Sequence, residues 1–263
     1  MTYALQLSEA ERERYRFMAE SARAEELVQW TAAGIVSGAR VADVGCGPGA
    51  ILRLLAEEVG EGGRADGVDL DSGAVTAAAE QVAGLIQASA RVGEATATEL
   101  EPGSYDVVMC RHVLAHNGGH EAAIIAHLVA LARPGGAIYL VDIDAAAMRL
   151  HPDDPDIADL HARYVDLHRS RGNNINIGPM LGTLLETTGL QVESFRSGGP
   201  VFRIPPQLRT PAWAARDALV AARLATGKDL RRWAAAFERV DALPTRPWMT
   251  VASFMAVGRK PGS

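Results

Sequence analysis

The feature that most constrains this chain is a glycine-rich turn between an apolar segment and a helical one. Residues 40–44 (RVADV) have the composition of a buried strand, residues 45–49 (GCGPG) follow at once, and residues 50–59 (AILRLLAEEV) carry large apolar side chains at helical spacing. Glycines allow a tight turn and a close approach of a ligand to the main chain, and the first turn of a helix presents free N–H groups. The segment therefore predicts a strand–turn–helix unit that binds a ligand with polar groups.

The alternation continues after this unit. We expect strands at 64–69, 104–110 and 137–143, separated by helices at 71–83 and 119–132. Strands that alternate with helices indicate an α/β fold with a parallel, doubly wound sheet. The 263 residues contain no internal repeat and no low-complexity linker, so we expect a single domain over 1–263 with the binding core at 38–144.

Helical segments flank this core. A helix is expected at 8–36, where Ser8 and Glu11 have the spacing of a capping box. After residue 144 we expect helices at 156–171, 179–188 and 207–240 (broken near Gly227) and strands at 190–196 and 249–257. Such long excursions are more often covers of a ligand site than idle loops. Segments 1–37, 145–180 and 197–249 are therefore interpreted as caps.

Composition narrows the partners. The net charge is −6 and apolar residues make up 48% of the chain, without a run long enough to span a membrane. A general nucleic-acid binder needs a basic stripe, which disfavours that class. The first residues lack the apolar core of a signal peptide, so we expect a cytoplasmic protein with no nucleic-acid or membrane partner. The two cysteines, Cys46 and Cys110, argue against a disulfide scaffold or a cysteine-rich zinc site.

Asp69 strengthens the interpretation of the glycine-rich turn. It ends the second expected strand, where a carboxylate can accept hydrogen bonds from both hydroxyls of a ribose. The glycine spacing, G-x-G-x-G, departs from the G-x-G-x-x-G of dinucleotide binders because Ala50 stands in the last position. A looser form of that pattern allows alanine there, so a nicotinamide or flavin cofactor is disfavoured without being excluded.

Five segments in order resemble the motif set of class I S-adenosylmethionine-dependent methyltransferases. They are VADVGCGPGA, GVDLD, VGEATATEL, SYDVVMCRHVLAH and ARPGGAIYLVD, within residues 40–144. Residues 1–39 and the stretch RGNNINIGPMLGTLLETTGL resemble the bacterial branch that acts on small molecules. The resemblance implies a Rossmann-like, mostly parallel sheet of seven strands with helices on both faces and helical cap insertions. It also implies S-adenosyl-L-methionine as the cofactor.

The resemblance assigns roles residue by residue. Gly45, Cys46, Gly47 and Gly49 belong to the loop under the methionine part of the cofactor, and Asp43 holds this loop or the amino group of the cofactor. Asp69 binds the ribose and Leu70 packs on the adenine. Glu94 and Ala95 lie beside the adenine, although the family often has the shorter aspartate at position 94. Arg111 lies near the methionine moiety.

Histidines supply the candidate catalytic groups. His112 and His116 follow the fourth expected strand, and we rank His116 first and His112 second as a general base. A role of His116 in shaping the pocket is an equal alternative. Residues 117–119 (NGG) interrupt any helix that would bring His120 onto the same face, so no metal site is expected. His161 and His168 share a face of the 156–171 helix, for which a solvated face is the favoured interpretation; the alternative is that the helix is a cap and one of the two histidines faces the substrate.

The reaction expected from these features is methyl transfer to a small molecule. The acceptor atom can be oxygen, nitrogen or carbon, because the sequence does not distinguish them. One alternative is methylation of a peptide or another macromolecule, which the caps disfavour. Another is a protein that binds the cofactor without methyl transfer. We expect a monomer or a homodimer.

Overall fold

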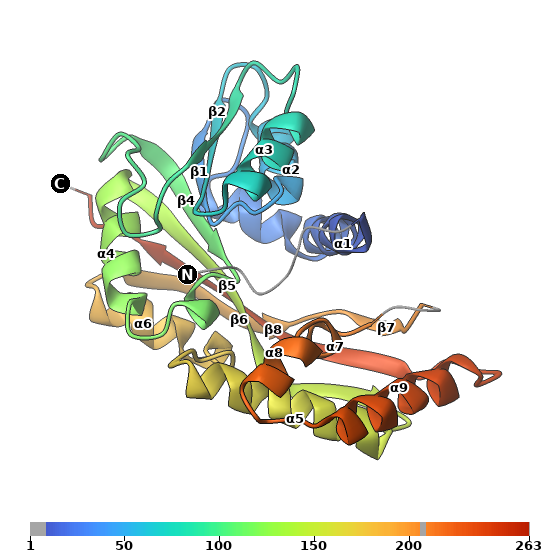
Figure 1. The fold of residues 1–263 in the computed structure, drawn as a ribbon. Helices are drawn as coiled ribbons and strands as arrows, with labels where there is room; N and C mark the ends of the chain where they lie inside the picture. The colour runs from blue at the N-terminus through green and yellow to red at the C-terminus, as the bar shows by residue number, and fades with distance from the viewer. Residues whose placement is uncertain (1–8, 206–208, 263) are drawn as a thin grey trace.

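The computed structural model describes residues 9–205 and 209–262, with residues 9–14 described by their backbone alone. In the described part, eight strands form one sheet in the order β3-β2-β1-β4-β5-β8-β6, and β7 also pairs with β8 (Figure 1). β1 to β5 run parallel, whereas β8 is antiparallel to its neighbours. The strands are β1 (Arg40–Val44), β2 (Arg64–Asp69), β3 (Ala88–Val92), β4 (Tyr105–Arg111), β5 (Ala132–His151), β6 (Gln191–Gly198), β7 (Val201–Arg203) and β8 (Trp248–Arg259). This confirms the doubly wound, mostly parallel α/β fold and adds the short β7.

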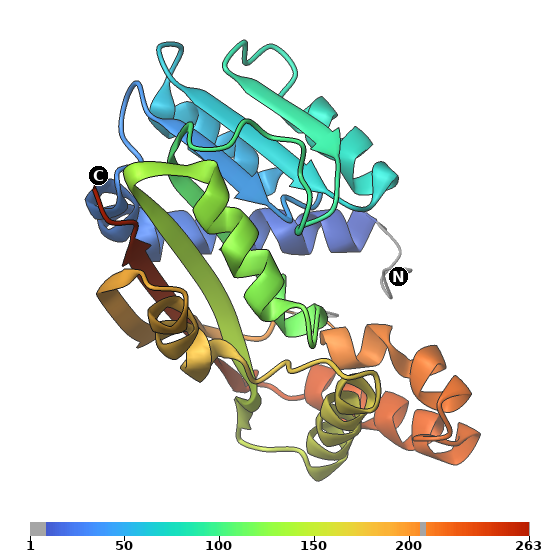
Figure 2. The ribbon, with the colours of Figure 1, turned by 90° about the vertical axis from the view of Figure 1, so that its left-hand side faces the viewer.

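Helices cover both faces of the sheet (Figure 2). One face is packed by α1 (Glu9–Ala33), α2 (Ala50–Val59) and α3 (Ser72–Gln81). The other is packed by α4 (Glu121–Leu131) and α6 (Leu181–Thr187), with the short turns η1 (Leu114–His116) and η2 (Gly178–Met180) near strand ends. Each face of the sheet therefore packs into its own hydrophobic cluster.

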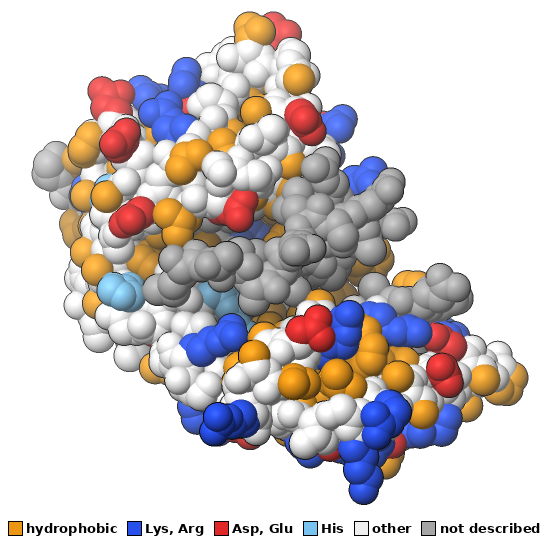
Figure 3. All heavy atoms as spheres, in the orientation of Figure 1, with side chains coloured by type: hydrophobic (Ala, Val, Ile, Leu, Met, Phe, Trp, Pro, Cys, Tyr) orange, Lys and Arg blue, Asp and Glu red, His pale blue; other side chains and the backbone are white. Residues whose placement is uncertain are grey.

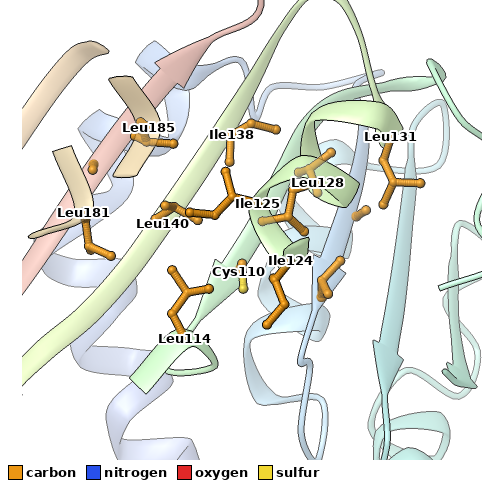
Figure 4. Close-up of a cluster of buried hydrophobic side chains, with 14 of the residues drawn as sticks. Cys110, Leu114, Ile124, Ile125, Leu128, Leu131, Ile138, Leu140, Leu181 and Leu185 are labelled. Carbon is orange, nitrogen blue, oxygen red and sulfur yellow. The ribbon is translucent and has the colours of Figure 1, made fainter. Parts of the chain in front are cut away.

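β4 shows why a continuous apolar run was expected to be buried on both sides. Val108 and Cys110 join the cluster with α4 and α6, whereas Val107 and Met109 face α1 and α2. Successive strand residues point to opposite faces, so a strand covered twice has no polar alternation. Figure 4 shows one of these clusters, in which Cys110 lies among leucine and isoleucine side chains from α4, β5 and α6.

β5 has 20 residues and is much longer than the expected strand at 137–143, whereas β8 has 12 residues and extends the expected strand at 249–257 only slightly. β5 runs to His151, inside the segment that was interpreted as a helical cap, so the strand end expected at residue 143 is wrong. The pairing is irregular between Asp144 and Arg149 and then resumes, with Leu150 opposite Met249. The antiparallel partner satisfies the backbone groups of this extension, a long-range pairing that local sequence patterns do not reveal.

The extension carries the cap. α5 (Pro155–Ser170), α7 (Pro211–Ala214), α8 (Arg216–Ala221) and α9 (Gly227–Asp241) pack on it around a third hydrophobic cluster that contains Leu150, Trp233 and Phe237 (Figure 1). Arg232 of α9 forms ion pairs with Asp156 and Asp159 of α5. The helix expected at 207–240 is three helices, the last of which starts at a capping box of Thr226.

Other boundaries agree closely with expectation. β1, α2 and β2 have the expected bounds, and α1 ends at Ala33. The capping box expected at Ser8 lies outside the described residues. Within the described residues, no helix is long and apolar enough to cross a membrane.

Candidate functional site

The glycine-rich turn after β1 adopts a backbone that only glycine accepts easily. Gly45, Gly47 and Gly49 have φ values of 84°, 53° and 84°. A Cβ at Gly45 would overlap the Val113 side chain, and one at Gly49 would come within 2.8 Å of the Ala78 Cβ. At Gly47 a Cβ would meet only Tyr15 of α1, with 3.8 Å to its Cε1. The turn is therefore closely packed at its two ends and faces α1 in the middle.

Asp43 lies beneath this turn, at the end of β1. Its side chain is 2% exposed, and Oδ2 has no hydrogen-bond partner among the described residues. Burial raises the pKa of this carboxyl to about 7, although the positive charge of Arg111 works in the opposite direction. A buried carboxylate oxygen without a donor is costly, so this atom is suited to a cationic donor brought by a ligand.

Asp69 ends β2 and contacts the same turn. Its Oδ2 accepts a hydrogen bond from the Gly47 N–H at 2.8 Å, and its Oδ1 accepts one from the Asp71 N–H at 3.0 Å. Each oxygen keeps a lone pair for a further donor. Leu70, next in the chain after β2, is 53% exposed.

The segment after β3 lies next to Asp69. The Gly93 N–H donates to the Asp69 carbonyl oxygen at 3.0 Å, and this brings Glu94 and Ala95 to the same edge of the sheet. Glu94 is exposed and Ala95 is partly buried against the core. The structure thus brings together the sequence-predicted residues of β1, β2 and β3, as expected at the carboxyl ends of parallel strands.

Arg111, expected near the methionine moiety, forms a buried ion pair with Glu26 of α1. Its two terminal nitrogens donate to the two Glu26 oxygens at 2.5 and 3.0 Å. Trp30 and Tyr139 also donate to Glu26. Sequence reasoning missed Glu26, although an acid on the face that also carries Trp30, one turn on, is a signal of a buried partner.

His112 follows β4 in a constrained conformation. Its φ is 55°, rare for a residue with a side chain, and its N–H donates to the Val141 carbonyl oxygen at 2.8 Å. The His112 Nδ1 lies 3.7 Å from Oδ1 of the buried Asp142. Asp142 also accepts a hydrogen bond from the Ala115 N–H. It lies within β5, where its neighbour Val141 pairs with the last residue of β4.

His116 lies on η1 and packs against the cap. Its ring centroid is 5.1 Å from that of His168 on α5, which is in turn 4.6 Å from the ring of Tyr164. The solvated face expected for His161 and His168 is wrong, because His168 is only 6% exposed and His161 contacts the Ala145 carbonyl oxygen. The long β5 places α5 against the core, so this helix face is buried.

α1 extends from the glycine-rich turn to the cap. Phe17 makes an edge contact with Phe202 of β7, with 5.6 Å between ring centroids. Figure 3 shows histidine side chains between the core above and the cap below, and many lysine and arginine side chains on the cap. α1 thus passes the glycine-rich turn at Tyr15, and α5 packs against His116 of η1. Both helices lie next to residues of the candidate site.

Comparisons with known proteins agree with this geometry. A family model described as a methyltransferase domain matches residues 41–136. An uncharacterized protein in transposon TN4556 of Streptomyces fradiae is 28% identical over 184 residues, 70% of this chain and 52% of that protein. A ubiquinone biosynthesis O-methyltransferase of Methylococcus capsulatus is 32% identical over 106 residues, 40% of this chain and 43% of that protein. The chain thus spans about half the length of these curated relatives.

Solved structures share the fold. A putative methyltransferase from Bacillus halodurans superposes with a TM-score of 0.58 at 18% identity, over 90% of this chain and 99% of that one. Phosphoethanolamine N-methyltransferase 2 of Haemonchus contortus, in complex with S-adenosyl-L-methionine, gives a TM-score of 0.53 at 17% identity, over 90% of this chain and 52% of that one. At these identities the likeness concerns the fold alone.

Proposed function

We propose that this chain, whose residues 41–136 match a methyltransferase domain, is a class I S-adenosylmethionine-dependent methyltransferase and transfers the methyl group of S-adenosylmethionine to a small-molecule acceptor. The observation that carries the proposal is Asp43 Oδ2, a buried carboxylate oxygen without a donor among the described residues, directly beneath the glycine-rich turn. The ammonium group of the methionine moiety is a donor of the right charge for this atom.

The other residues at this edge of the sheet fit the same cofactor. Asp69 keeps lone pairs for the two ribose hydroxyls, and the exposed Leu70 offers an apolar surface to an adenine ring. Glu94 and Ala95 adjoin Asp69 through Gly93. Gly47 has no Cβ and faces Tyr15 of α1, and we assign the methionine part of the cofactor to this side of the turn. Arg111, tied to Glu26, acts by holding α1 and by its charge near Asp43.

Catalysis then requires alignment and exclusion of water. When bound, S-adenosylmethionine supplies a sulfonium methyl group that is already electrophilic. The caps 1–37, 145–180 and 197–249 hold the acceptor and keep water out. A ring nitrogen of His116 takes the proton from a hydroxyl acceptor, with His112 as the second candidate. The buried Asp142 carboxylate lies 3.7 Å from Nδ1 of His112.

An oxygen acceptor is the class that we favour. Relatives of this chain include a ubiquinone biosynthesis O-methyltransferase and nocamycin O-methyltransferase, and a hydroxyl of moderate acidity is the acceptor for which a neutral imidazole is a useful base. A monomer or homodimer, a cytoplasmic location and the absence of nucleic-acid partners stay predictions.

The test is transfer of a labelled methyl group. The full chain is incubated with S-adenosylmethionine carrying a deuterated methyl group and with a panel of phenols, enols and amines, and products are identified by mass spectrometry. We expect label in a phenol or enol together with S-adenosylhomocysteine. Calorimetry that finds NAD binding and no binding of either adenosyl compound would contradict the proposal.

A further inference from the structure

The C-terminal end of α5 is attached to the loop that follows His116. Gly118 approaches Gly172 so closely that a Cβ on Gly118 would overlap the Gly172 carbonyl oxygen. The Gly118 N–H donates to Oδ1 of Asn173 at 3.4 Å. The Nδ2 of Asn173 lies 3.3 Å from Nδ1 of His168. A continuous chain of contacts therefore runs from the main chain beside His116, through Asn173, to the ring that packs on His116.

These contacts through Asn173 determine which ring nitrogen of His168 carries a proton. A backbone N–H can only donate, so the Asn173 atom that faces Gly118 is the amide oxygen. The other end of the amide is then NH₂, which can only donate. Nδ1 of His168 must accept this hydrogen bond and carries no proton. His168 is therefore a neutral imidazole with its proton on Nε2.

The surroundings of His168 favour the same state. The ring is buried between His116 of η1 and Tyr164 of its own helix, and the charge of Arg171 acts on it from the end of α5. Burial, then His116 and then Arg171, lower the pKa of His168 to about 4. At neutral pH the ring that contacts His116 thus carries no charge.

We propose that His168 and Asn173 are positioning residues, which hold a neutral imidazole against His116 and so allow His116 to accept the proton of the methyl acceptor. The inference rests on the proposed function, because it assigns the base of that reaction. Proton transfer to His116 creates a positive charge, and a positive charge on His168 at this distance would oppose it. The base, His116, therefore comes from the core, and the residues that position it, His168 and Asn173, come from the cap.

Nuclear magnetic resonance tests the protonation state without any methyl transfer. The full chain is labelled with ¹⁵N-histidine, and the His168 signals are assigned by their loss in His168→Gln. We expect an unprotonated Nδ1, a protonated Nε2 and no titration between pH 5 and 8. A proton on Nδ1, or titration near the usual histidine pKa, would overturn the proposal.

Kinetics test the consequence with a matched pair of variants. In Asn173→Asp a carboxylate faces Nδ1 and favours a protonated His168, whereas Asn174→Asp adds the same charge one residue away, where the side chain contacts Met180 and the Asn176 N–H. Under the proposal only the enzyme with a neutral His168 is active, and the new carboxylate raises the pKa of His168. We therefore expect the acid limb of kcat to move to higher pH by about one unit in Asn173→Asp only, with unchanged affinity for S-adenosylhomocysteine.

The outcomes separate the two proposals. Acid limbs that coincide in the two variants would overturn the positioning role even where methyl transfer is confirmed. Loss of methyl transfer in the unmodified chain would overturn the proposed function, and the labelled-histidine spectra would still decide the state of His168. Those spectra use the unmodified chain, so a failure of Asn173→Asp to fold leaves the proposal open to refutation.

Discussion

Buried charges set the chemistry of this site. Asp43 and Arg111 lie on neighbouring strands, yet Arg111 gives both of its terminal nitrogens to Glu26, and Asp43 Oδ2 is left without a donor among the described residues. A fully paired Asp43 would have little left for a ligand. Burial of the Asp43 carboxylate without a donor therefore destabilises the free protein. This is expected where a bound ligand supplies the missing hydrogen-bond donor.

Asp43→Asn should weaken binding of S-adenosylmethionine and S-adenosylhomocysteine about 10- to 100-fold, because a charge-assisted hydrogen bond contributes about 1.5–3 kcal/mol. Calorimetry measures both affinities. Affinities equal to those of the unmodified chain would place the ammonium group elsewhere.

The same substitution should alter the pH dependence of stability. The Asp43 pKa is raised in the folded state, so folding binds a proton at this carboxyl and stability is lost as pH rises from about 4, the usual value, through about 7. An asparagine side chain does not titrate, so Asp43→Asn should gain stability relative to the unmodified chain over this interval. Urea unfolding of both proteins at pH 4.5 and 8 measures the difference. An equal difference at the two pH values would show that Asp43 titrates normally.

His116→Ala should lower kcat about 10²- to 10⁴-fold while the affinity for S-adenosylhomocysteine stays nearly constant, which is the pattern of a lost general base. His112→Ala is the comparison, for which we expect a smaller fall. A raised KM with little change in kcat, in a folded His116→Ala protein, would indicate that His116 only shapes the pocket.

Several contacts between elements attach the caps to the core beside the candidate site. α1 is anchored by Glu26 and Trp30, passes over Gly47 at Tyr15 and reaches β7 at Phe17. α5 contacts the core through His161 at the Ala145 carbonyl oxygen and through His168 against His116, and Gly172, just after α5, packs against Gly118. Tyr15 faces Gly47 and Gly118 follows His116, so two of these attachments adjoin residues of the proposed site, and we expect cofactor binding to affect the position of the caps.

Cofactor should therefore protect the N-terminal segment. We expect S-adenosylhomocysteine to slow proteolytic cleavage within residues 1–37, and the protection to decrease in Phe17→Ala, which loses the contact with Phe202. Val28→Ala is the control, since Val28 is 76% exposed. Cleavage that is indifferent to the cofactor would show that α1 is no part of the cover.

Gly118→Ala should lower the free energy of unfolding by about 1–3 kcal/mol, because the added methyl group overlaps the main chain of Gly172 and forces the two segments apart. Gly62→Ala is the matched control, since a Cβ at Gly62 meets nothing within 4 Å. Urea denaturation measures both variants. Equal denaturation midpoints would show that the loop after His116 accommodates the added methyl group without loss of stability.

The whole molecule is held together by β5 and β8, which run from the core of the sheet into the cap. Tyr139 and Val257 belong to the sheet core, whereas Leu150 and Met249, on the same two strands, belong to the cap cluster. Continuous strands with shared hydrogen bonds do not provide the flexible linker at which separate domains part.

Thermal unfolding should accordingly occur in one transition, with equal calorimetric and van't Hoff enthalpies. Differential scanning calorimetry tests the single-domain interpretation. Two resolved transitions, one of them moved by S-adenosylhomocysteine and the other not, would show that the cap folds as a separate unit.

Much of the core could be read from residues that are neighbours in the chain. The glycine-rich turn, the apolar runs of β1 and β4 and the helical spacing of residues 50–59 report local preferences, and these predicted the parallel sheet and the edge at which Asp43, Asp69 and Glu94 gather. Parallel strands end at one edge whatever lies elsewhere, so no distant contact was needed for that prediction.

The remaining features depend on partners far apart in the chain. The extension of β5 requires the pairing of Leu150 with Met249, and the ion pair of Arg111 requires Glu26, 85 residues away. Burial of His168 follows from the same extension, which carries α5 to the loop after His116 and turns an apparently solvated helix face into part of the site. Local patterns do not report such contacts, because hydrogen-bond partners and burial are properties of the folded chain as a whole.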